Sequence, residues 1–579
     1  MNEAFPTHKH LFLLVGIAVL IAFAPALPIR FIQDDVGVII QNRDLTVSNI
    51  PTMAGKSYWG KVLVLEDPWR PGHHLYRPIP VMMFAVEKAV FGMTTWPYRI
   101  INLLFHALCS VLVALLCARL LEGWKEAGWV PLFAGLLFAV HAVHFEPVVH
   151  IVGRAEMGMT AATLAAFLCI DRARTDTRWV YVMIVLGLAA TLFKEQGLLG
   201  PVLVGAYWLM SSEPGERKNL IRFAIGTLAW MVFYLIVREW AIDGYGPSHL
   251  ELPLANYSFG HRAAIMSVAF LKYIQLAIIP SEILLNYHHI RLIAPDSMLS
   301  PVALLGLLAA VGIIAGCVIG YRKNRPDLML GFGLIIIGLG PVSNLFLPVG
   351  VLMAERLLYL PTAGVCLLIA ALLKGRLGTG RRMAISAIPL LFMVGLCWNH
   401  TWLYKDPIRV AVHYAQNYPK APRLQEMAGI TFEQYKRFEE ARACYLRQRM
   451  FDPENQRPDI NMARCTIQEL QDILLKVIPM DEARKAILTG RMQQEMVRLK
   501  QFGNFEKAPF HLAQALYLLD RFDEAKIEFL NAVHNGERGS GSRREAARVL
   551  LDMERFKFGK NRLSPDLIDE LEAVLAGDL

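Results

Sequence analysis

The apolar residues of this chain are gathered in long runs within its first 403 positions. Runs such as 11–29 and 299–320 reach the roughly 20 apolar residues with which a helix crosses a hydrocarbon layer. No run of that length follows Trp402, and the chain becomes rich in Glu, Arg, Lys and Gln. The pattern predicts an all-α protein with a polytopic membrane domain over 1–403 and a soluble helical domain over 404–579.

Eleven segments are predicted to span the membrane. The first has few basic residues before it and no small-residue cleavage site after it, so we expect a retained anchor rather than a removed signal peptide. The predicted spans are roughly 11–29, 100–121, 130–147, 155–171, 179–193, 196–211, 219–238, 299–320, 328–347, 353–373 and 383–403.

Basic loops predict the orientation of these spans, because Lys and Arg concentrate in short cytoplasmic loops. The loops DRARTDTR, SSEPGERKN, YRKNRPD and KGRLGTGRR all fall on one side if the N-terminus is cytoplasmic. Residues 263–280 are apolar enough to span, but a crossing there would move the last two loops outside. We therefore predict that 239–298 is one external segment with an interfacial or re-entrant helix. The amphipathic stretch 79–95 is read in the same way.

Composition supports lipid as the solvent for much of the chain, since 55% of its residues are hydrophobic against roughly 45–50% in soluble domains. The net charge of +9 fits basic cytoplasmic loops, and without a basic stripe interleaved with aromatic residues we expect no nucleic-acid partner. Six of the eight cysteines lie in apolar spans, and there is no zinc spacing. The other two, Cys444 and Cys465, lie in separate predicted helices and make only a weak case for a disulfide.

An acidic pair follows the first predicted span, in FIQDDVGVII. Carboxylates at a membrane surface are costly to desolvate, so Asp34 and Asp35 either remain hydrated in a turn or have a role. The functional reading is a general base that deprotonates an acceptor hydroxyl, with the neighbouring carboxylate holding the acceptor or a divalent ion.

Further ionisable residues lie at the predicted external ends of spans. HAVHFEPVVH holds His141, His144 and Glu146, which are either hydrogen-bonding groups or metal ligands. In VGRAE, a charge at the mouth of a span needs a partner or a phosphate. The two charged residues of that motif are Arg154 and Glu156.

Two more charged pairs are placed similarly. Lys194 and Glu195 interrupt apolar sequence in LFKEQGLLGP, as a tight turn or as part of a phosphate site. Glu355 and Arg356 open the tenth predicted span. An arginine at a helix N-terminus opposes the helix dipole, so Arg356 is expected to have an anionic partner in Glu355, Asp35 or a lipid phosphate.

These motifs, in this order, resemble the transmembrane and tetratricopeptide-repeat O-mannosyltransferases, which are membrane-embedded GT-C glycosyltransferases that use lipid-phosphate sugars. One departure is Ala142, where that family usually has proline between the two histidines. The C-terminal array is also shorter than in the animal members, which suggests a bacterial relative and leaves the acceptor open. The matching stretches are FIQDDVGVI, YRPIPVMMFAVEKAVFGMTTWPYRIINLLFHAL, LLFAVHAVHFEPVVHIVGRAE, FKEQG and GPVSNLFLPVGVLMAERLLYLPTAG.

The resemblance implies transfer of a sugar, mannose by default, from a polyprenyl phosphate to an acceptor hydroxyl with inversion. Asp35 or Asp34 would be the base. Fixed cations would stabilise charge on the departing phosphate, with Lys194, Arg356 and Arg154 as candidates. The remaining candidates would support the site. They are His141, His144, Glu146, Glu156, Glu195 and Glu355. No cofactor is required, although a divalent cation is compatible with the acidic pair.

The soluble domain reads as helical hairpins. Residues 422–455 fit a tetratricopeptide repeat of about 34 residues, and a second partial match lies in FDEAKIEFLNAV. Such an α-solenoid either caps the membrane domain or binds a protein or glycan acceptor. At the expected offsets of the first repeat are Gly429, Phe432, Ala441, Tyr445 and Pro453, and in the second Ala525, Phe529 and Ala532.

Two other functions compete with glycosyl transfer. A transporter or flippase for a lipid-linked glycan would place charges at mid-membrane, whereas the charges here cluster at one predicted face. A non-enzymatic assembly factor would not need an intact acidic pair. The expected location is a bacterial inner membrane, with the active face and the repeat domain in the periplasm.

Overall fold

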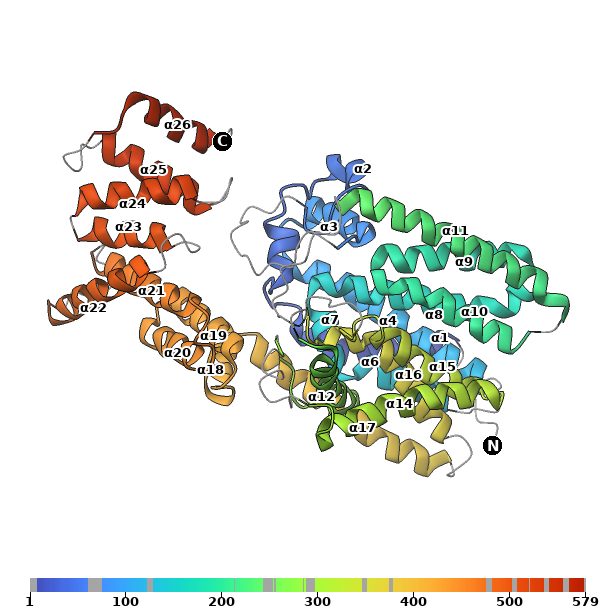
Figure 1. The fold of residues 1–579 in the computed structure, drawn as a ribbon. Helices are drawn as coiled ribbons and strands as arrows, with labels where there is room; N and C mark the ends of the chain where they lie inside the picture. Colours follow the sequence, from blue (N-terminus) through green and yellow to red (C-terminus); the bar gives the residue numbers. More distant parts are fainter. Residues whose placement is uncertain are drawn as a thin grey trace. The chain divides into compact units, whose positions relative to one another are not determined.

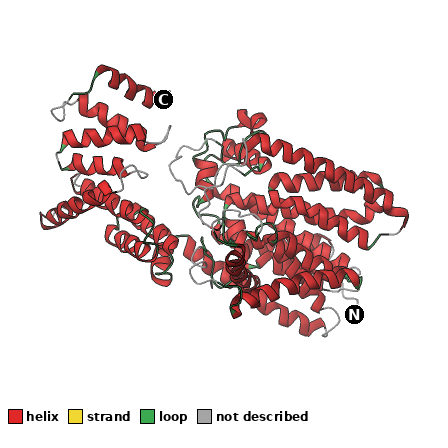
Figure 2. Cartoon of the chain, in the orientation of Figure 1, coloured by secondary structure: helices red, strands yellow, loops and turns green. Residues whose placement is uncertain are grey.

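The computed structural model describes the chain as two compact units, one up to Lys405 and one from Asp406 onwards. Helices dominate the described residues, which contain no extended strand (Figure 2). The described residues are 8–60, 75–121, 129–212, 214–242, 254, 257–284, 286–287, 297–345, 351–373, 379–474, 482–501, 508–519, 521–535, 541–555 and 562–576. The predicted basic loop KGRLGTGRR and the external segment 239–298 fall partly outside them.

The first unit is a helical assembly in which α8, α9, α10 and α11 lie side by side (Figure 1). Its helices are α1 (His8–Phe23), α2 (Ile50–Met53), α3 (Pro78–Phe91), α4 (Thr95–Leu120), α6 (Val130–Val140), α7 (Phe145–Val149), α8 (Arg154–Thr175), α9 (Thr177–Phe193), α10 (Gly200–Met210), α11 (Arg217–Ile242), α12 (Phe259–Ile278), α14 (Pro301–Arg322), α15 (Pro326–Leu339), α16 (Tyr359–Leu373) and α17 (Thr379–Tyr404). Short helical turns are η1 (Ala24–Ala26), η2 (Val36–Ile40), η3 (Val47–Asn49), η4 (Ala142–His144), η5 (Ile151–Gly153), η6 (Glu195–Leu199), η7 (Pro214–Glu216) and η9 (Glu355–Leu358).

All eleven apolar segments predicted as spans contain helices. Among the described residues, five helices are long and apolar enough to cross a membrane, and six if the bent pair Val130–Val140 and Ala142–Val149 is one crossing. Several others are apolar but shorter, such as Thr177–Phe193. The chain is therefore a multi-pass membrane protein by composition and helix length, whereas the count of eleven crossings stays a prediction.

Local chemistry explains where several of these helices begin. Ser300 caps α14 by accepting a hydrogen bond from the Ala303 amide, and Pro301 occupies the first turn, where its missing N–H costs nothing. Asp176 caps α9 in the same way through the Arg178 amide. The apolar side chains of α14 are largely exposed, as expected of a helix that faces lipid.

One face of α4 is polar although the helix is one of the candidate spans. Arg99, Asn102, His106 and Ser110 recur at spacings of three or four and are all buried. Side chains at this spacing share one helix face. That face turns toward the loops that follow α1 and α7, so α4 holds these loops by polar contacts rather than by apolar packing alone.

Helices also occupy the two stretches predicted to lie at the interface. α12 covers most of 263–280, and α3 covers most of 79–95. Glu87 and Lys88, which interrupt the apolar pattern of α3, both have internal partners. Glu87 pairs with Arg154, and the Lys88 Nζ donates to the Ile39 carbonyl at 2.7 Å.

In the second unit, consecutive helices pack against one another in chain order. The small and aromatic residues that suggested a repeat are buried between them, and Gly429 lies against the ring of Tyr445. Cys444 and Cys465 are both free thiols. The helices are α18 (Pro407–Asn417), α19 (Pro422–Gln434), α20 (Phe438–Phe451), α21 (Arg457–Leu474), α22 (Glu482–Gln501), α23 (Ala508–Leu518), α24 (Phe522–Asn535), α25 (Gly541–Arg555) and α26 (Pro565–Ala576).

Candidate active site

The two residues of the acidic pair after α1, Asp34 and Asp35, lie in different surroundings. Asp35 is fully buried, and its carboxylate accepts hydrogen bonds from the Ile32 amide at 3.2 Å and the Val152 amide at 3.0 Å. Burial raises the pKa of this carboxyl, against the nearby charges of His150 and Arg99. Asp35 thus ties the loop to the start of α8.

Asp34 is only half-buried, and no hydrogen bond or ion pair joins its carboxylate to another residue that the structure describes. Its charge acts on Arg356 and on the hydroxyl of Tyr58. Of the two aspartates, Asp34 is therefore the one whose carboxylate is available to a substrate.

The loop that carries both aspartates is held by Arg99 of α4. Its guanidinium donates to the Leu27 carbonyl at 3.2 Å, the Arg30 carbonyl at 2.7 Å and the Val149 carbonyl at 2.9 Å, and it also bonds the Ile29 carbonyl. One buried side chain therefore fixes the end of α1 against the end of α7, which sets the position of the acidic pair.

Glu146 of α7 and Arg356 of η9 form an ion pair. The Arg356 Nη1 lies 2.5 Å from the Glu146 Oε1, and the Arg356 amide donates to the Oε2 at 2.8 Å. The partner of Arg356 is thus Glu146 rather than Glu355 or Asp35. Glu355 is instead held by the Tyr287 hydroxyl and by the Leu284 amide at 2.8 Å.

Lys194 and Glu195 reach two different partners because the chain turns between α9 and η6. The Lys194 Nζ lies 2.7 Å from the Glu156 Oε1, and both side chains are buried. Glu195 accepts from the Arg77 Nε at 2.9 Å and from the Tyr76 amide at 3.0 Å. These two ion pairs bring the FKEQG motif together with the starts of α8 and α3.

The cations Arg77, Lys194 and Arg356 form one group, since Lys194 interacts electrostatically with both arginines. Each cation uses only one of its side-chain N–H groups to bond its partner carboxylate. Among the described residues, no further partner meets the two terminal amino groups of Arg77 or the Nε and Nη2 of Arg356. The group thus has hydrogen-bond donors left for an anion.

Arg154 has a different place. It is fully buried, and all three of its nitrogens are bonded. The Nε donates to the Asn102 Oδ1 at 3.1 Å, the Nη1 pairs with Glu87, and the Nη2 donates to the Tyr98 carbonyl at 3.1 Å. These bonds join α3, α4 and α8, and because the side chain is fully buried, its remaining N–H groups are not exposed to a phosphate.

The first two histidines of HAVHFEPVVH form hydrogen bonds with the backbone. The Nε2 of His141 is 3.0 Å from the Ala277 carbonyl, and its Nδ1 caps η4 through the Val143 amide. The Nδ1 of His144 is 2.9 Å from the Phe138 carbonyl. Within the part of the chain that the structure describes, no three His, Cys, Asp or Glu side chains are grouped to hold a metal ion.

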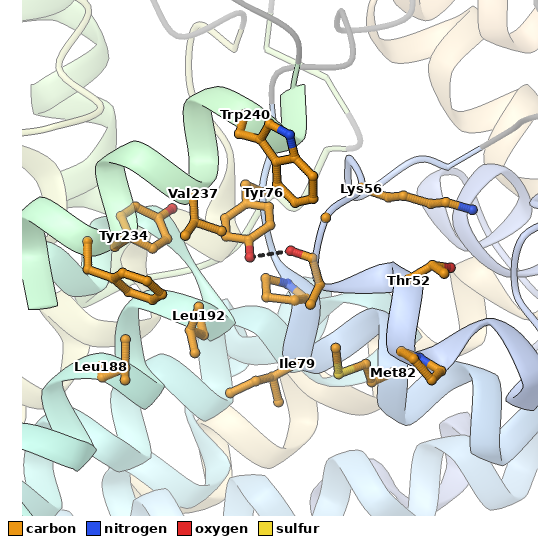
Figure 3. Close-up of a pocket in the computed structure, with 15 residues that line it drawn as sticks. Thr52, Lys56, Tyr76, Ile79, Met82, Leu188, Leu192, Tyr234, Val237 and Trp240 are labelled. Atoms are coloured by element: carbon orange, nitrogen blue, oxygen red, sulfur yellow. Dashed lines mark hydrogen bonds between the residues drawn. The ribbon is translucent and has the colours of Figure 1, made fainter.

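An apolar cavity of about 710 Å³ adjoins the Arg77–Glu195 pair, because Tyr76 and Pro78, on either side of Arg77, both line it. Figure 3 shows Tyr76, Tyr234 and Trp240 gathered over apolar side chains of α3 and α9. Gly55 permits this arrangement, since an added Cβ would lie 2.5 Å from the Trp240 ring. The cavity is lined by Pro51, Thr52, Ala54, Gly55, Lys56, Tyr76, Pro78, Ile79, Met82, Leu188, Leu192, Phe233, Tyr234, Val237 and Trp240.

Sequence reasoning missed three residues that shape the site. Arg99 carries a detectable signal, since it opens the polar stripe of α4. Arg77 lies in YRPIP, within a stretch that resembles the family but does not by itself single out the arginine. Tyr58 has no sequence signal, because nothing local indicates that its ring lies under Arg77, with the guanidinium carbon 5.2 Å from the ring centre.

Comparison with known proteins identifies relatives over the region that holds these residues. The human "Protein O-mannosyl-transferase TMTC3" is 27% identical over 394 residues, which cover 62% of this chain and 42% of the relative. The mouse "Protein O-mannosyl-transferase TMTC4" is 29% identical over 409 residues, covering 62% and 54%. The chain is a distant homologue of these proteins. The predicted relationship is thereby confirmed, and the chain spans about half the length of these curated relatives.

Two further comparisons add little. No protein-family model matches the chain. The crystal structure of ArnT from Cupriavidus metallidurans bound to undecaprenyl phosphate aligns with 81% of this chain and 80% of its own, at 14% identity and a TM-score of 0.38. A likeness this weak supports no conclusion about the site.

Proposed function

We propose that the chain is a membrane glycosyltransferase that moves a sugar, mannose by its relatives' example, from a polyprenyl-phosphate donor to an acceptor hydroxyl with inversion. One observation carries the proposal. Among the described residues the Asp34 carboxylate has no bonded partner, and its charge acts on Arg356, one of three cations that retain N–H groups for an anion. An apolar cavity is lined by the chain neighbours of a second of these cations, Arg77. A base, a phosphate site and a place for an isoprenoid chain are the parts that such a transfer needs.

In this proposal Asp34 takes the proton from the acceptor hydroxyl, and the acceptor oxygen attacks the anomeric carbon. The bond from that carbon to the phosphate oxygen breaks, and the polyprenyl phosphate leaves with the electron pair. Negative charge on the phosphate grows as the bond breaks, so donors of Arg77, Lys194 and Arg356 stabilise the transition state more than the ground state. Phosphate is already a good leaving group, so this route needs no metal ion.

The apolar cavity supports a lipid-linked donor over a nucleotide-linked one. Its lining is dominated by aliphatic and aromatic side chains from α3, α9 and α11, and its size is in the range of ligand sites. An isoprenoid chain buried there would place its phosphate beside Arg77. The acceptor is proposed to be a protein hydroxyl on the extracytoplasmic face, because the relatives are named as protein O-mannosyl-transferases.

A transfer assay tests the function. Purified protein is mixed with a polyprenyl phosphate carrying radiolabelled mannose and with an extract of extracytoplasmic proteins. We expect label to move to protein and to be lost in Asp34→Asn. Movement of intact donor across proteoliposome membranes without transfer would favour a flippase. Binding of the donor with neither outcome would favour an assembly factor.

A further inference from the structure

The side chain of Tyr58 is buried beneath Arg77, yet its hydroxyl is unsatisfied among the described residues. The residue is 3% exposed, and among the described residues its hydroxyl meets no hydrogen-bond donor or acceptor. A buried hydroxyl without a partner costs free energy, so such a group in a native site calls for an explanation. Its backbone is well held, since its amide donates to the Leu75 carbonyl at 2.8 Å.

The charges around Tyr58 are those of the proposed site. Arg77 lies over one face of the ring, and Glu156 and Asp34 are close enough for their charges to act on the hydroxyl. Tyr58 therefore lies within electrostatic range of both the proposed base and the proposed phosphate site. Neither carboxylate accepts a hydrogen bond from it.

We propose that the Tyr58 hydroxyl donates a hydrogen bond to a phosphate oxygen of the polyprenyl-phosphate donor. This inference rests on the proposed function and adds to it a residue that binds the anionic group. A phosphate fits this place because the Arg77 guanidinium lies against the ring and its terminal amino groups have no partner among the described residues. In this proposal an anion drawn to those amino groups also meets the hydroxyl.

The charges around Tyr58 favour a hydroxyl that donates a hydrogen bond. Burial raises the pKa of Tyr58, and the carboxylates of Glu156 and Asp34 raise it further against the opposing effect of Arg77. The hydroxyl therefore keeps its proton next to an anion, where it can donate but carries no repelling charge.

Binding measurements with two ligands test this proposal. The ligands are undecaprenyl phosphate and the uncharged undecaprenol, presented in the same detergent. We expect Tyr58→Phe to weaken binding of the phosphate by about 10- to 100-fold, the range for one hydrogen bond to a charged group. Binding of the alcohol should stay unchanged and the melting temperature should not fall, because among the described residues the lost hydroxyl has no partner.

Tyr98→Phe is the matched control. Tyr98 belongs to the same buried cluster, but its hydroxyl donates to the Gly92 carbonyl at 2.8 Å. This variant should melt lower and bind the phosphate normally. Equal phosphate affinity in Tyr58→Phe and wild type, or an equal loss for both ligands, overturns the role of Tyr58. A wild-type protein that does not prefer the phosphate to the alcohol overturns the proposed function itself.

Discussion

Asp34 and Asp35 are neighbours in the chain but meet different surroundings. Asp35 satisfies two backbone amides, whereas Asp34 interacts with Arg356 through its charge alone. Two adjacent carboxylates can therefore divide their roles, one fixing the loop and the other facing substrate.

These separate roles predict that substitution of Asp34 lowers activity, whereas substitution of Asp35 lowers stability. Asp34→Asn should lower transfer by about two orders of magnitude or more, the scale for losing a general base, and leave the melting temperature unchanged. Asp35→Asn should lower stability by about 1–3 kcal/mol, because an amide nitrogen would then face a backbone N–H. Turnover and thermal unfolding of both purified variants measure this. Full transfer in Asp34→Asn would contradict the assignment.

Arg356 can hold either a phosphate or Glu146. Arg356→Lys should weaken donor binding, since lysine keeps the charge but loses the planar fork. Arg356→Gln should also slow transfer and lower stability by leaving Glu146 buried without its cation.

The double variant Arg356→Gln, Glu146→Gln separates these effects. It removes the pair as a whole, so we expect the melting temperature to recover while donor affinity and turnover stay low. Recovery of all three quantities would mean that Arg356 serves only Glu146.

At the scale of helices, small residues let neighbouring elements approach. In the second unit, a Cβ added at Gly429 would lie 2.5 Å from the ring of Tyr445. That ring is buried, and its hydroxyl donates to Glu433 at 2.8 Å, so it has little room to move.

Gly429→Ala should therefore destabilise the second unit by about 1–3 kcal/mol, as overpacking does. Gly490 of α22 is the matched control, since nothing lies within 4 Å of an added Cβ there. Gly490→Ala should stabilise the helix by about 0.5–1 kcal/mol. Thermal unfolding of both variants decides this. Equal effects would argue against close helix packing at Gly429.

At the scale of the whole molecule, the predicted topology places the acidic pair, Lys194, Arg356 and the second unit on one side of the membrane. A periplasmic reporter enzyme fused after residue 404 should be active, and one fused at 214–218 should be inactive. As the control, a reporter that is active only in the cytoplasm should be inactive after residue 404 and active at 214–218. Cytoplasmic activity after residue 404 would contradict the predicted orientation and separate the second unit from the proposed site.

Much of the architecture follows from sequence alone, because lipid and helix geometry act on local composition. Each of the eleven apolar runs contains a helix, and the shift in composition near residue 404 coincides with the division at Lys405. The order of the motifs also sufficed to identify the distant relatives. Ionisable residues beside apolar runs were found for the same reason, since charge next to lipid is costly unless it has a use.

Only the tertiary structure decided which of these residues meet. Glu146 and Arg356 are 210 positions apart, and Lys194 and Glu156 are 38 apart, so no local pattern could pair them. The same holds for Arg154, whose three bonds come from α3 and α4, and for Tyr58, whose neighbours come from distant segments. The role of a side chain depends on which partners lie within its reach, and the packing of the helices determines those partners.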